Sequence, residues 1–400
     1  IKDMILNGTL TEGDMLPSIR GLAKDLRISV ITTKRAYDEL EREGYVNTVA
    51  GKGCFVAGTN RELIQEENLK KIEADPAVSG RLWHYKRRIS GNVSDLGGRG
   101  MNTADVGMTI GGTEMYETQT NAIEMKHVTK KYASFQLEDV SLTLPSGCIM
   151  GLVGENGAGK STTIGLIMGS IRRDAGEIFV LGQDNTKKEF DAVKEDIGVV
   201  LDEAYFPEVL NAVNVNQIMK HTYQRWDEKQ YFDYIKHFSL EEKKMFKDYS
   251  RGMKMKLAIA VALSHKPKLL ILDEATSGLD PIIRDEILEI FNEFTREEDH
   301  TVLLSSHIIS DLEKISDYIA FLHQGKLLFC EEKDRLLEEY GILQVTEEEE
   351  KDIPKEAIAG RKQGKYATEL LVKRSKISDA FEIECAGIED IVLFLARKGE

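Results

Sequence analysis

The stretch CIMGLVGENGAGKSTTIGLI at residues 148–167 decides the fold of the largest part of the chain. It begins with IMGLV at residues 149–153, an apolar run typical of a buried parallel strand. The segment GENGAGKST follows and matches the pattern G-x-x-x-x-G-K-[ST], and an apolar helical segment comes next. A strand, a glycine loop and a helix in this order predict an α/β domain with a phosphate-binding loop.

The predicted loop would hold the phosphate chain of a nucleotide through its backbone and two side chains. Gly154, Gly157 and Gly159 allow a tight turn in which successive N–H groups point at phosphate oxygens. The following helix adds the positive end of its dipole. Lys160 is expected to contact the β- and γ-phosphates, and the Ser161 hydroxyl to ligate Mg²⁺. The sequence thus predicts ATP and Mg²⁺ as cofactors and the nucleotide-binding residues Gly154, Glu155, Asn156, Gly157, Ala158, Gly159, Lys160, Ser161 and Thr162.

A second chemical motif lies at residues 269–274, which read LLILDE. Four apolar residues predict a buried strand whose carboxyl end presents Asp273 and Glu274, at the edge of the sheet where ligands bind. Asp273 is expected to hold Mg²⁺ through water, because Mg²⁺ keeps part of its hydration shell. Glu274 would polarise the attacking water, a role worth about 10²–10⁴ in rate.

Further motifs lie around these two in a fixed order. YSRGM at residues 249–253 opens a helical run just before the acidic strand, ATSGLDP follows Glu274, and TVLLSSH places His307 at a strand end. Ahead of the glycine loop, VTKKY ends in Tyr132. With these motifs, residues 121–343 resemble the ATP-hydrolysing subunits of ABC transporters. The resemblance implies an α/β P-loop ABC ATPase domain, with a mixed sheet and a helical subdomain.

The resemblance also implies roles for these motifs. In the family, the signature segment of one subunit binds the γ-phosphate of ATP held by a second ATPase subunit, and an aromatic residue in the place of Tyr132 stacks on adenine. His307 would hydrogen-bond the γ-phosphate and hold Glu274 and the water in line. The implied catalytic residues are Glu274, His307 and Lys160. The signature residues are Ser250, Arg251, Gly252 and Met253, and the D-loop residues are Ser277, Gly278, Leu279 and Asp280.

Two positions depart from the family pattern. The usual signature LSGGQ has glycine where this chain has Arg251, and glutamine where it has Met253. A glutamine that touches Mg²⁺ in the family is replaced by Asp202, which would reach the metal through water. With YSRGM, the segments GKYATELLV at residues 364–372 and GIEDIVLFLARKGE at residues 387–400 resemble the bacterial exporter subfamily called ABC-2.

Residues 13–57 carry a separate pattern. Pro17 and Ser18 start a helix whose apolar residues lie on one face, and a break at residues 27–29 leads into a second helix that Ser29 can cap. Residues 45–57 alternate as two strands around an Ala-Gly turn at 50–51. The expected inward-facing residues are Ile19, Leu22, Ala23 and Leu26 on the first helix, and Ala36, Tyr37 and Leu40 on the second.

This order of elements is an α+β winged helix-turn-helix, and nearly all of residues 1–58 resemble the GntR family of bacterial repressors. The resemblance implies operator DNA as a partner, with the second helix in the major groove. The candidate DNA-binding residues are Arg20, Ser29, Thr32, Thr33, Lys34, Arg35 and Lys52. Eight basic and eight acidic residues balance in this segment. A winged helix used only for protein contacts therefore remains an alternative.

Composition and residue pattern divide the chain into five parts. After the winged helix at 1–58, a charged helix is expected at 59–75, for dimerisation, and a linker at 76–120, with eight glycines between residues 80 and 112. The ATPase domain spans 121–343, and a small module spans 344–400. The linker is either an ordinary variable one or the product of joining two reading frames. Because the chain opens at Ile1 in what looks like a helix, its true N-terminus is expected to be missing.

Composition limits the function classes. With 53 basic and 68 acidic residues, the net charge of −15 argues against a chain coated for nucleic-acid binding. The four scattered cysteines predict neither a disulfide nor a zinc framework. No apolar run approaches the roughly 18 residues of a membrane span, and no secretory leader opens the chain. A role at the membrane would therefore need another polypeptide.

The leading hypothesis is ATP hydrolysis that drives an export-type ABC transporter. Its partners would be transmembrane permease subunits and a second ABC ATPase subunit, either the same chain or a sister. The protein would be cytoplasmic and held at the inner face of the membrane through the permease. Two alternatives remain: a transcription regulator whose DNA affinity responds to ATP, or an accidental fusion of a GntR-type repressor with its neighbouring transporter ATPase.

Overall fold

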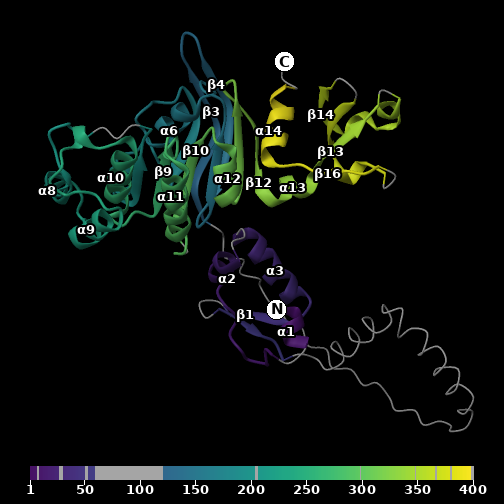
Figure 1. The fold of residues 1–400 in the computed structure, drawn as a ribbon, viewed down its shortest axis with the longest axis horizontal. Helices are drawn as coiled ribbons and strands as arrows, with labels where there is room; N and C mark the ends of the chain where they lie inside the picture. The colour runs from purple at the N-terminus through teal and green to yellow at the C-terminus, as the bar shows by residue number, and fades with distance from the viewer. Residues whose placement is uncertain are drawn as a thin grey trace, which may run out of the picture. The chain divides into compact units, whose positions relative to one another are not determined.

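A computed structural model describes residues 1–6, 9–26, 30–49, 53–58, 120–202, 206–297, 299–346, 348–364, 367–378 and 381–397. The chain divides into two compact units (Figure 1). The helix expected at 59–75 and nearly all of the linker expected at 76–120 lie outside the described residues.

The N-terminal unit has the elements of a winged helix-turn-helix. Three helices, α1 (Lys2–Leu6), α2 (Ile19–Leu26) and α3 (Val30–Arg42), precede the antiparallel strands β1 (Val46–Val49) and β2 (Gly53–Val56). The Ser18 hydroxyl accepts a hydrogen bond of 3.0 Å from the Gly21 N–H at the start of α2. The predicted order of two helices and two strands is therefore confirmed, while the break at 27–29 and the turn at 50–51 lie outside the described residues.

A small core holds this unit together. It consists of Ile5, Leu16, Tyr37, Leu40, Tyr45, Val46, Cys54 and Val56. The Tyr37 hydroxyl donates a hydrogen bond of 2.8 Å to the Pro17 carbonyl. Two predicted inward-facing residues are exposed: Ala36, and Leu26 at the end of α2. Along α3, Thr33, Tyr37 and Leu40 form the buried stripe, and Ala36 lies outside it.

The larger unit is built on a sheet with strand order β12-β11-β5-β10-β9-β8. Its strands are β5 (Ile149–Val153), β8 (Ile197–Val200), β9 (Leu269–Asp273), β10 (Thr301–Ser306), β11 (Tyr318–His323) and β12 (Lys326–Glu332). Neighbours pair in parallel except β11 with β12, so the expected mixed sheet is confirmed. Val153 pairs with Ser306, and Ser305 pairs with Asp273. The carboxyl ends of β5, β10 and β9 are therefore level.

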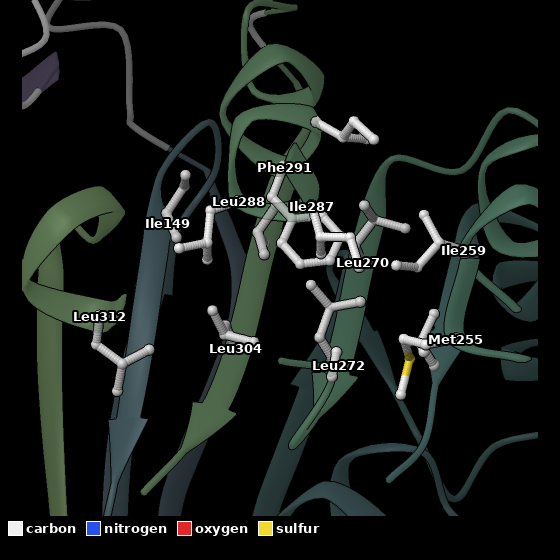
Figure 2. Close-up of a cluster of buried hydrophobic side chains, with 14 of the residues drawn as sticks. Ile149, Met255, Ile259, Leu270, Leu272, Ile287, Leu288, Phe291, Leu304 and Leu312 are labelled. Atoms are coloured by element: carbon white, nitrogen blue, oxygen red, sulfur yellow. The ribbon is translucent and has the colours of Figure 1, made fainter. Parts of the chain in front are cut away.

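The core lies on both faces of this sheet. On one face, Ile287, Leu288 and Phe291 of α11 (Pro281–Phe294) lie against Leu270 and Leu304 of the strands (Figure 2). On the other face, α6 (Lys160–Ile167) packs with a second, antiparallel sheet in one apolar cluster. That sheet has the order β4-β3-β6-β7 and consists of β3 (Asn121–Lys131), β4 (Gln136–Pro145), β6 (Ala175–Val180) and β7 (Gln183–Asp184).

A helical segment follows β8 at one edge of the central sheet (Figure 1). It contains α8 (Ala212–Thr222), α9 (Glu228–His237) and α10 (Arg251–Leu263). The short α7 (Phe190–Val193) lies before β8 and is not part of this segment. Each of the three helices starts at a polar N-cap residue: Asn211, Asp227 and Ser250. Because α10 leads directly into β9, the signature segment is linked to the acidic strand.

The C-terminal part follows β12 at the opposite edge of the central sheet. After α13 (Lys333–Glu339), the strands β13 (Tyr340–Val345), β14 (Ile358–Gln363), β15 (Thr368–Lys373) and β16 (Glu384–Cys385) form a sheet of order β14-β15-β13-β16. The last helix, α14 (Ile388–Arg397), buries Phe394 and Ile391 in the same cluster as Leu312 of α12 (Ile309–Ile315). The boundary expected between 343 and 344 falls inside β13. Within the described ranges, no helix is long and apolar enough to cross a membrane.

Candidate functional site

The glycine loop connects β5 to α6, as the sequence predicts. Gly157 and Gly159 have φ angles of +84° and +112°, which favour glycine. A Cβ atom at Gly159 would also lie only 2.9 Å from the Leu322 and Phe135 side chains, and one at Gly154 would lie 2.6 Å from the Leu322 carbonyl oxygen. The loop is therefore a close-fitting backbone cradle whose shape requires glycine.

Lys160 is the first residue of α6 and is almost fully buried, with 6% of its side chain exposed. Its Nζ atom donates a hydrogen bond of 2.7 Å to the Gly154 carbonyl and lies 3.2 Å from Glu274 Oε1. The ammonium group thus lies inside the loop that it follows. Of the other predicted loop residues, Glu155, Asn156, Gly157 and Ser161 are exposed, Thr162 is half-buried and Ala158 is buried.

Asp273 and Glu274 lie where β9 ends. Asp273 is buried and its Oδ1 atom accepts a hydrogen bond from the Ser305 hydroxyl of β10. Glu274 has 15% of its side chain exposed, and its Oε2 atom lies 2.6 Å from Nδ1 of His307, which follows β10. The level strand ends therefore bring together Lys160, Glu274 and His307, which are far apart in the sequence.

The backbone of Glu274 is held in an unusual conformation. Its φ angle of +50° is in the left-handed region, which non-glycine residues rarely adopt. The Glu274 N–H donates a hydrogen bond of 3.1 Å to the Ser305 carbonyl, and the Glu274 carbonyl accepts one of 3.0 Å from the Ser277 N–H. Such conformations cluster at functional sites, where surrounding contacts hold them in place.

Two residues at the site were missed from the sequence. Ser305 is one of three polar residues in the fully buried strand β10, and a polar residue beside its apolar centre was the available signal. Phe135 touches the glycine cradle, and its ring centroid lies 6.4 Å from that of Tyr132. Tyr132 itself is exposed just after β3, with Lys130 Nζ 5.5 Å from its ring centroid. Nothing local in FQLEDV distinguishes Phe135 from an ordinary strand residue.

The signature and the D-loop lie next to each other in the same chain. Ser250 caps α10 by accepting a hydrogen bond of 3.3 Å from the Met253 N–H, and Asp280 caps α11 by accepting one of 3.1 Å from the Ile283 N–H. Ser250, Arg251, Gly278 and Asp280 are exposed, Met253 and Ser277 are half-buried, and Gly252 and Leu279 are buried. Among the described residues, no hydrogen bond or ion pair joins the signature to the glycine loop.

The remaining predicted residues are less fully placed. Asp202 is exposed, two residues beyond the end of β8. On α3, Lys34 and Arg35 are exposed, Thr32 is half-buried and Thr33 is buried. Ser29, Lys52 and the Arg20 side chain lie outside the described residues. Lys34 and Arg35 therefore carry the accessible positive charge at the start of this helix.

Comparison with known proteins identifies both parts of the chain. The family model described as "ABC transporter" matches residues 137–277, and the model "Bacterial regulatory proteins, gntR family" matches residues 1–56. Bacitracin transport ATP-binding protein BcrA of Bacillus licheniformis is 36% identical over 212 residues, which are 52% of this chain and 68% of BcrA. The chain belongs to the ATP-binding proteins of ABC transporters.

Other members of the ABC family support this assignment. Lantibiotic transport ATP-binding protein SrtF of Streptococcus pyogenes is 33% identical over 215 residues, which are 53% of this chain and 91% of SrtF. The solved "Structure of ATP binding subunit of ABC transporter" is 27% identical, with a TM-score of 0.50, and the match covers 54% of this chain and 91% of that one. The larger unit is therefore an ABC ATPase and binds nucleotide, and the smaller one is a GntR-family domain.

The oxygen-rich donor set also fits the magnesium ion that ABC ATPases generally use. Mg²⁺ prefers oxygen ligands and keeps several waters, and the site offers an exposed Ser161 hydroxyl and the buried carboxylate of Asp273. Oε1 of Glu274, which lies 3.2 Å from Lys160 Nζ, is a further buried oxygen beside this pair.

Proposed function

We propose that this chain powers an export-type ABC transporter by hydrolysing ATP at the site around Lys160. One observation carries the proposal: Lys160, Glu274 and His307 form a connected group, with distances of 3.2 Å and 2.6 Å between successive partners. A carboxylate between a buried cation and an imidazole is suited to orient and polarise a water beside a phosphate group.

In this proposal the residues divide the work of hydrolysis. The backbone N–H groups of the glycine loop bind the phosphates, and Lys160 exchanges the Glu274 carboxylate for the β- and γ-phosphate oxygens. Glu274, thus released, accepts a hydrogen bond from the attacking water. His307 holds the Glu274 carboxylate and the γ-phosphate, and Tyr132 stacks on adenine. Mg²⁺, bound by Ser161 and by Asp273 and Asp202 through water, would neutralise charge on the phosphate chain.

We also propose that the working unit contains two ATPase subunits and a permease. Ser250, Arg251, Gly252 and Met253 of one subunit would face the ATP bound by the other, and the helix dipole and the Ser250 hydroxyl would bind its γ-phosphate. Residues 277–280 would lie at the same interface. A permease would hold the pair at the inner face of the cell membrane. The names of BcrA and SrtF, which refer to bacitracin and lantibiotic transport, favour an exported peptide antibiotic as cargo.

The substitution Glu274→Gln tests the assigned base. We expect E274Q to bind ATP, to lose about 10²–10⁴ in turnover, and to accumulate as an ATP-bound dimer in size-exclusion chromatography. Glu289→Gln, on the exposed side of α11, is the matched control and should hydrolyse ATP like the parent. Unchanged turnover of E274Q would remove Glu274 from this role.

The N-terminal match favours a second activity, DNA binding through α3. We propose that Lys34 and Arg35 contact DNA, because both are exposed near the start of the second helix of the helix-turn-helix. The double variant K34A/R35A should bind random-sequence duplex DNA more weakly and with a smaller salt dependence than the control R42A, at the other end of α3. Equal affinities would contradict this contact.

Adding ATP to the same DNA-binding assay distinguishes an ATP-responsive regulator from a chain with two independent activities. An ATP-responsive regulator requires that ATP change the DNA affinity of the whole chain, and that E274Q, which retains ATP, show the change most strongly. An affinity that ATP leaves unchanged would favour two independent activities on one chain.

A further inference from the structure

The start of the signature helix touches the D-loop of the same chain at Arg251. Gly278 has a φ angle of +68°, and a Cβ atom there would lie 2.6 Å from Nη1 and 2.9 Å from Cζ of Arg251. The guanidinium group therefore rests directly on the Gly278 backbone, in space that any side chain at 278 would need. The usual family signature has glycine in the place of Arg251, which could not make this contact.

Two further contacts join the same helices beyond this point. A Cβ atom at Gly252 would lie 3.2 Å from Cδ1 of Ile283, so the first turn of α10 already packs closely on α11. One turn later, Lys256 and Glu286 form an ion pair of 2.8 Å, in which the lysine side chain is largely buried. The first turns of α10 and α11 are thus held side by side, and Arg251 extends this packing onto the D-loop.

The D-loop in turn is bonded to the backbone of Glu274. The Ser277 N–H donates its hydrogen bond of 3.0 Å to the Glu274 carbonyl, and Gly278 is the next residue. Because Glu274 is in the left-handed region, its carboxylate direction depends on contacts that hold its backbone there. A shift of Gly278 would therefore pass through Ser277 and its hydrogen bond to the backbone of Glu274, the residue that would orient the water.

The positive charge of Arg251 is not stabilised by its position in the helix or by an ion pair among the described residues. It is the first residue of α10, where the helix dipole disfavours a positive charge. Within the described residues, its guanidinium group forms no hydrogen bond or ion pair. The contact recorded for its guanidinium group is with the surface of Gly278.

We propose that Arg251 is a positioning residue for hydrolysis: it holds the D-loop at Gly278 and thereby keeps Glu274 in place. The inference rests on the proposed function, because it assumes that Glu274 orients the attacking water. It assigns Arg251 a role within its own subunit, in addition to any contact across the interface.

Steady-state kinetics of the full chain test the proposal. R251G, which introduces the glycine usual in the family, should lower kcat by about tenfold or more, as expected when a reacting group is misplaced, and leave KM for ATP within about twofold. R251K keeps the charge and part of the stem, and should recover part of kcat. A kcat of R251G within twofold of the parent would overturn the proposal.

A double-mutant cycle isolates the contact itself. G278A strains the backbone in any background, but it displaces a guanidinium group only when Arg251 is present. We therefore expect G278A to lower kcat by a factor at least about threefold larger in the parent than in the R251G background. Equal factors in the two backgrounds would overturn the proposed contact.

Two measurements separate this inference from the proposed function. If the parent shows no ATP turnover that depends on Glu274, the proposed function fails and the inference fails with it. If turnover depends on Glu274 but R251G retains it, the inference alone fails. ATP-dependent dimers of E274Q should also persist in E274Q/R251G, and their loss would assign Arg251 to the interface instead of the D-loop.

Discussion

Glu274 combines a strained backbone with a side chain held from two sides. Left-handed backbone costs a non-glycine residue about 1–2 kcal/mol, and here the Ser305 carbonyl and the Ser277 N–H hold it in that conformation. The carboxylate lies between Lys160 and His307. The strained backbone is therefore that of the residue whose carboxylate must be oriented in the proposed reaction.

A pair of substitutions measures this strain. E274G and E274A both remove the carboxylate and its ion pair, but only alanine keeps a Cβ atom at a φ angle of +50°. We expect E274G to be more stable than E274A by about 1 kcal/mol in urea unfolding, although glycine usually destabilises a folded chain. A more stable E274A would show that the backbone relaxes at no cost.

The cysteines give a second test at the residue scale. Cys54 and Cys148 are buried, Cys385 is exposed, and burial raises the pKa of the Cys330 thiol to about 11. Thiol reagents react with an accessible thiolate. At neutral pH only Cys385 should therefore react rapidly with a disulfide reagent. C385S should remove that fast phase, and C330S should leave it unchanged.

At the scale of elements, His265 ties the helical segment to the central sheet. It follows α10, its ring is stacked 4.0 Å from that of Tyr223 at the end of α8, and Nε2 lies 3.1 Å from the Ile197 carbonyl of β8. Burial lowers the pKa of His265 below its usual 6.5, although the nearby backbone carbonyls oppose this effect. The neutral imidazole is therefore the form that the folded protein favours.

This pKa shift predicts how stability changes with pH. Below pH 6.5 the unfolded chain binds a proton at His265 that the folded chain does not, so the free energy of unfolding should fall as the pH falls. H265Q should lose stability at pH 7.5 through the lost stacking, and should show a weaker decline between pH 7.5 and 5.5 than the parent. Parallel pH profiles from thermal unfolding would contradict this assignment.

Elements with strong local signals were predictable from the sequence, while contacts between elements were not. Glycines at fixed spacing and an apolar run ending in two acids depend on local backbone geometry, so the glycine loop, β9 and the start of α10 were found. The hydrogen bond of Ser305, the ring of Phe135 and the Arg251–Gly278 contact join residues far apart in sequence. The same limit applies to Ala36, whose exposure depends on which side of α3 meets the rest of its module.

At the scale of the whole molecule, two units have separate apolar cores. One core surrounds Tyr37 and Val46, two lie on the faces of the central sheet, and one surrounds Leu343 and Leu370 of the C-terminal sheet. Units with their own cores can unfold independently. The smaller unit should then contribute the smaller unfolding enthalpy, since this enthalpy is about 0.7 kcal/mol per residue.

Scanning calorimetry of the whole E274Q chain tests this independence. We expect two transitions. ATP with Mg²⁺ should raise the midpoint temperature of the larger one only, which corresponds to a stabilisation of about 2.7 kcal/mol at an ATP concentration of 100 times Kd. The same scan without nucleotide is the control. A single transition, or two that ATP shifts together, would instead support communication between nucleotide and DNA binding.

The level ends of β5, β9 and β10 have a consequence for engineering this ATPase into a reporter. A residue inserted into one of these strands would turn its terminal side chain to the opposite face and separate Lys160, Glu274 and His307. The connections that enter the strands from the other edge of the sheet carry none of these residues. A fluorescent peptide placed after the exposed Arg296, in the connection between α11 and β10, should therefore be tolerated, and a graft one residue before Asp273 should not.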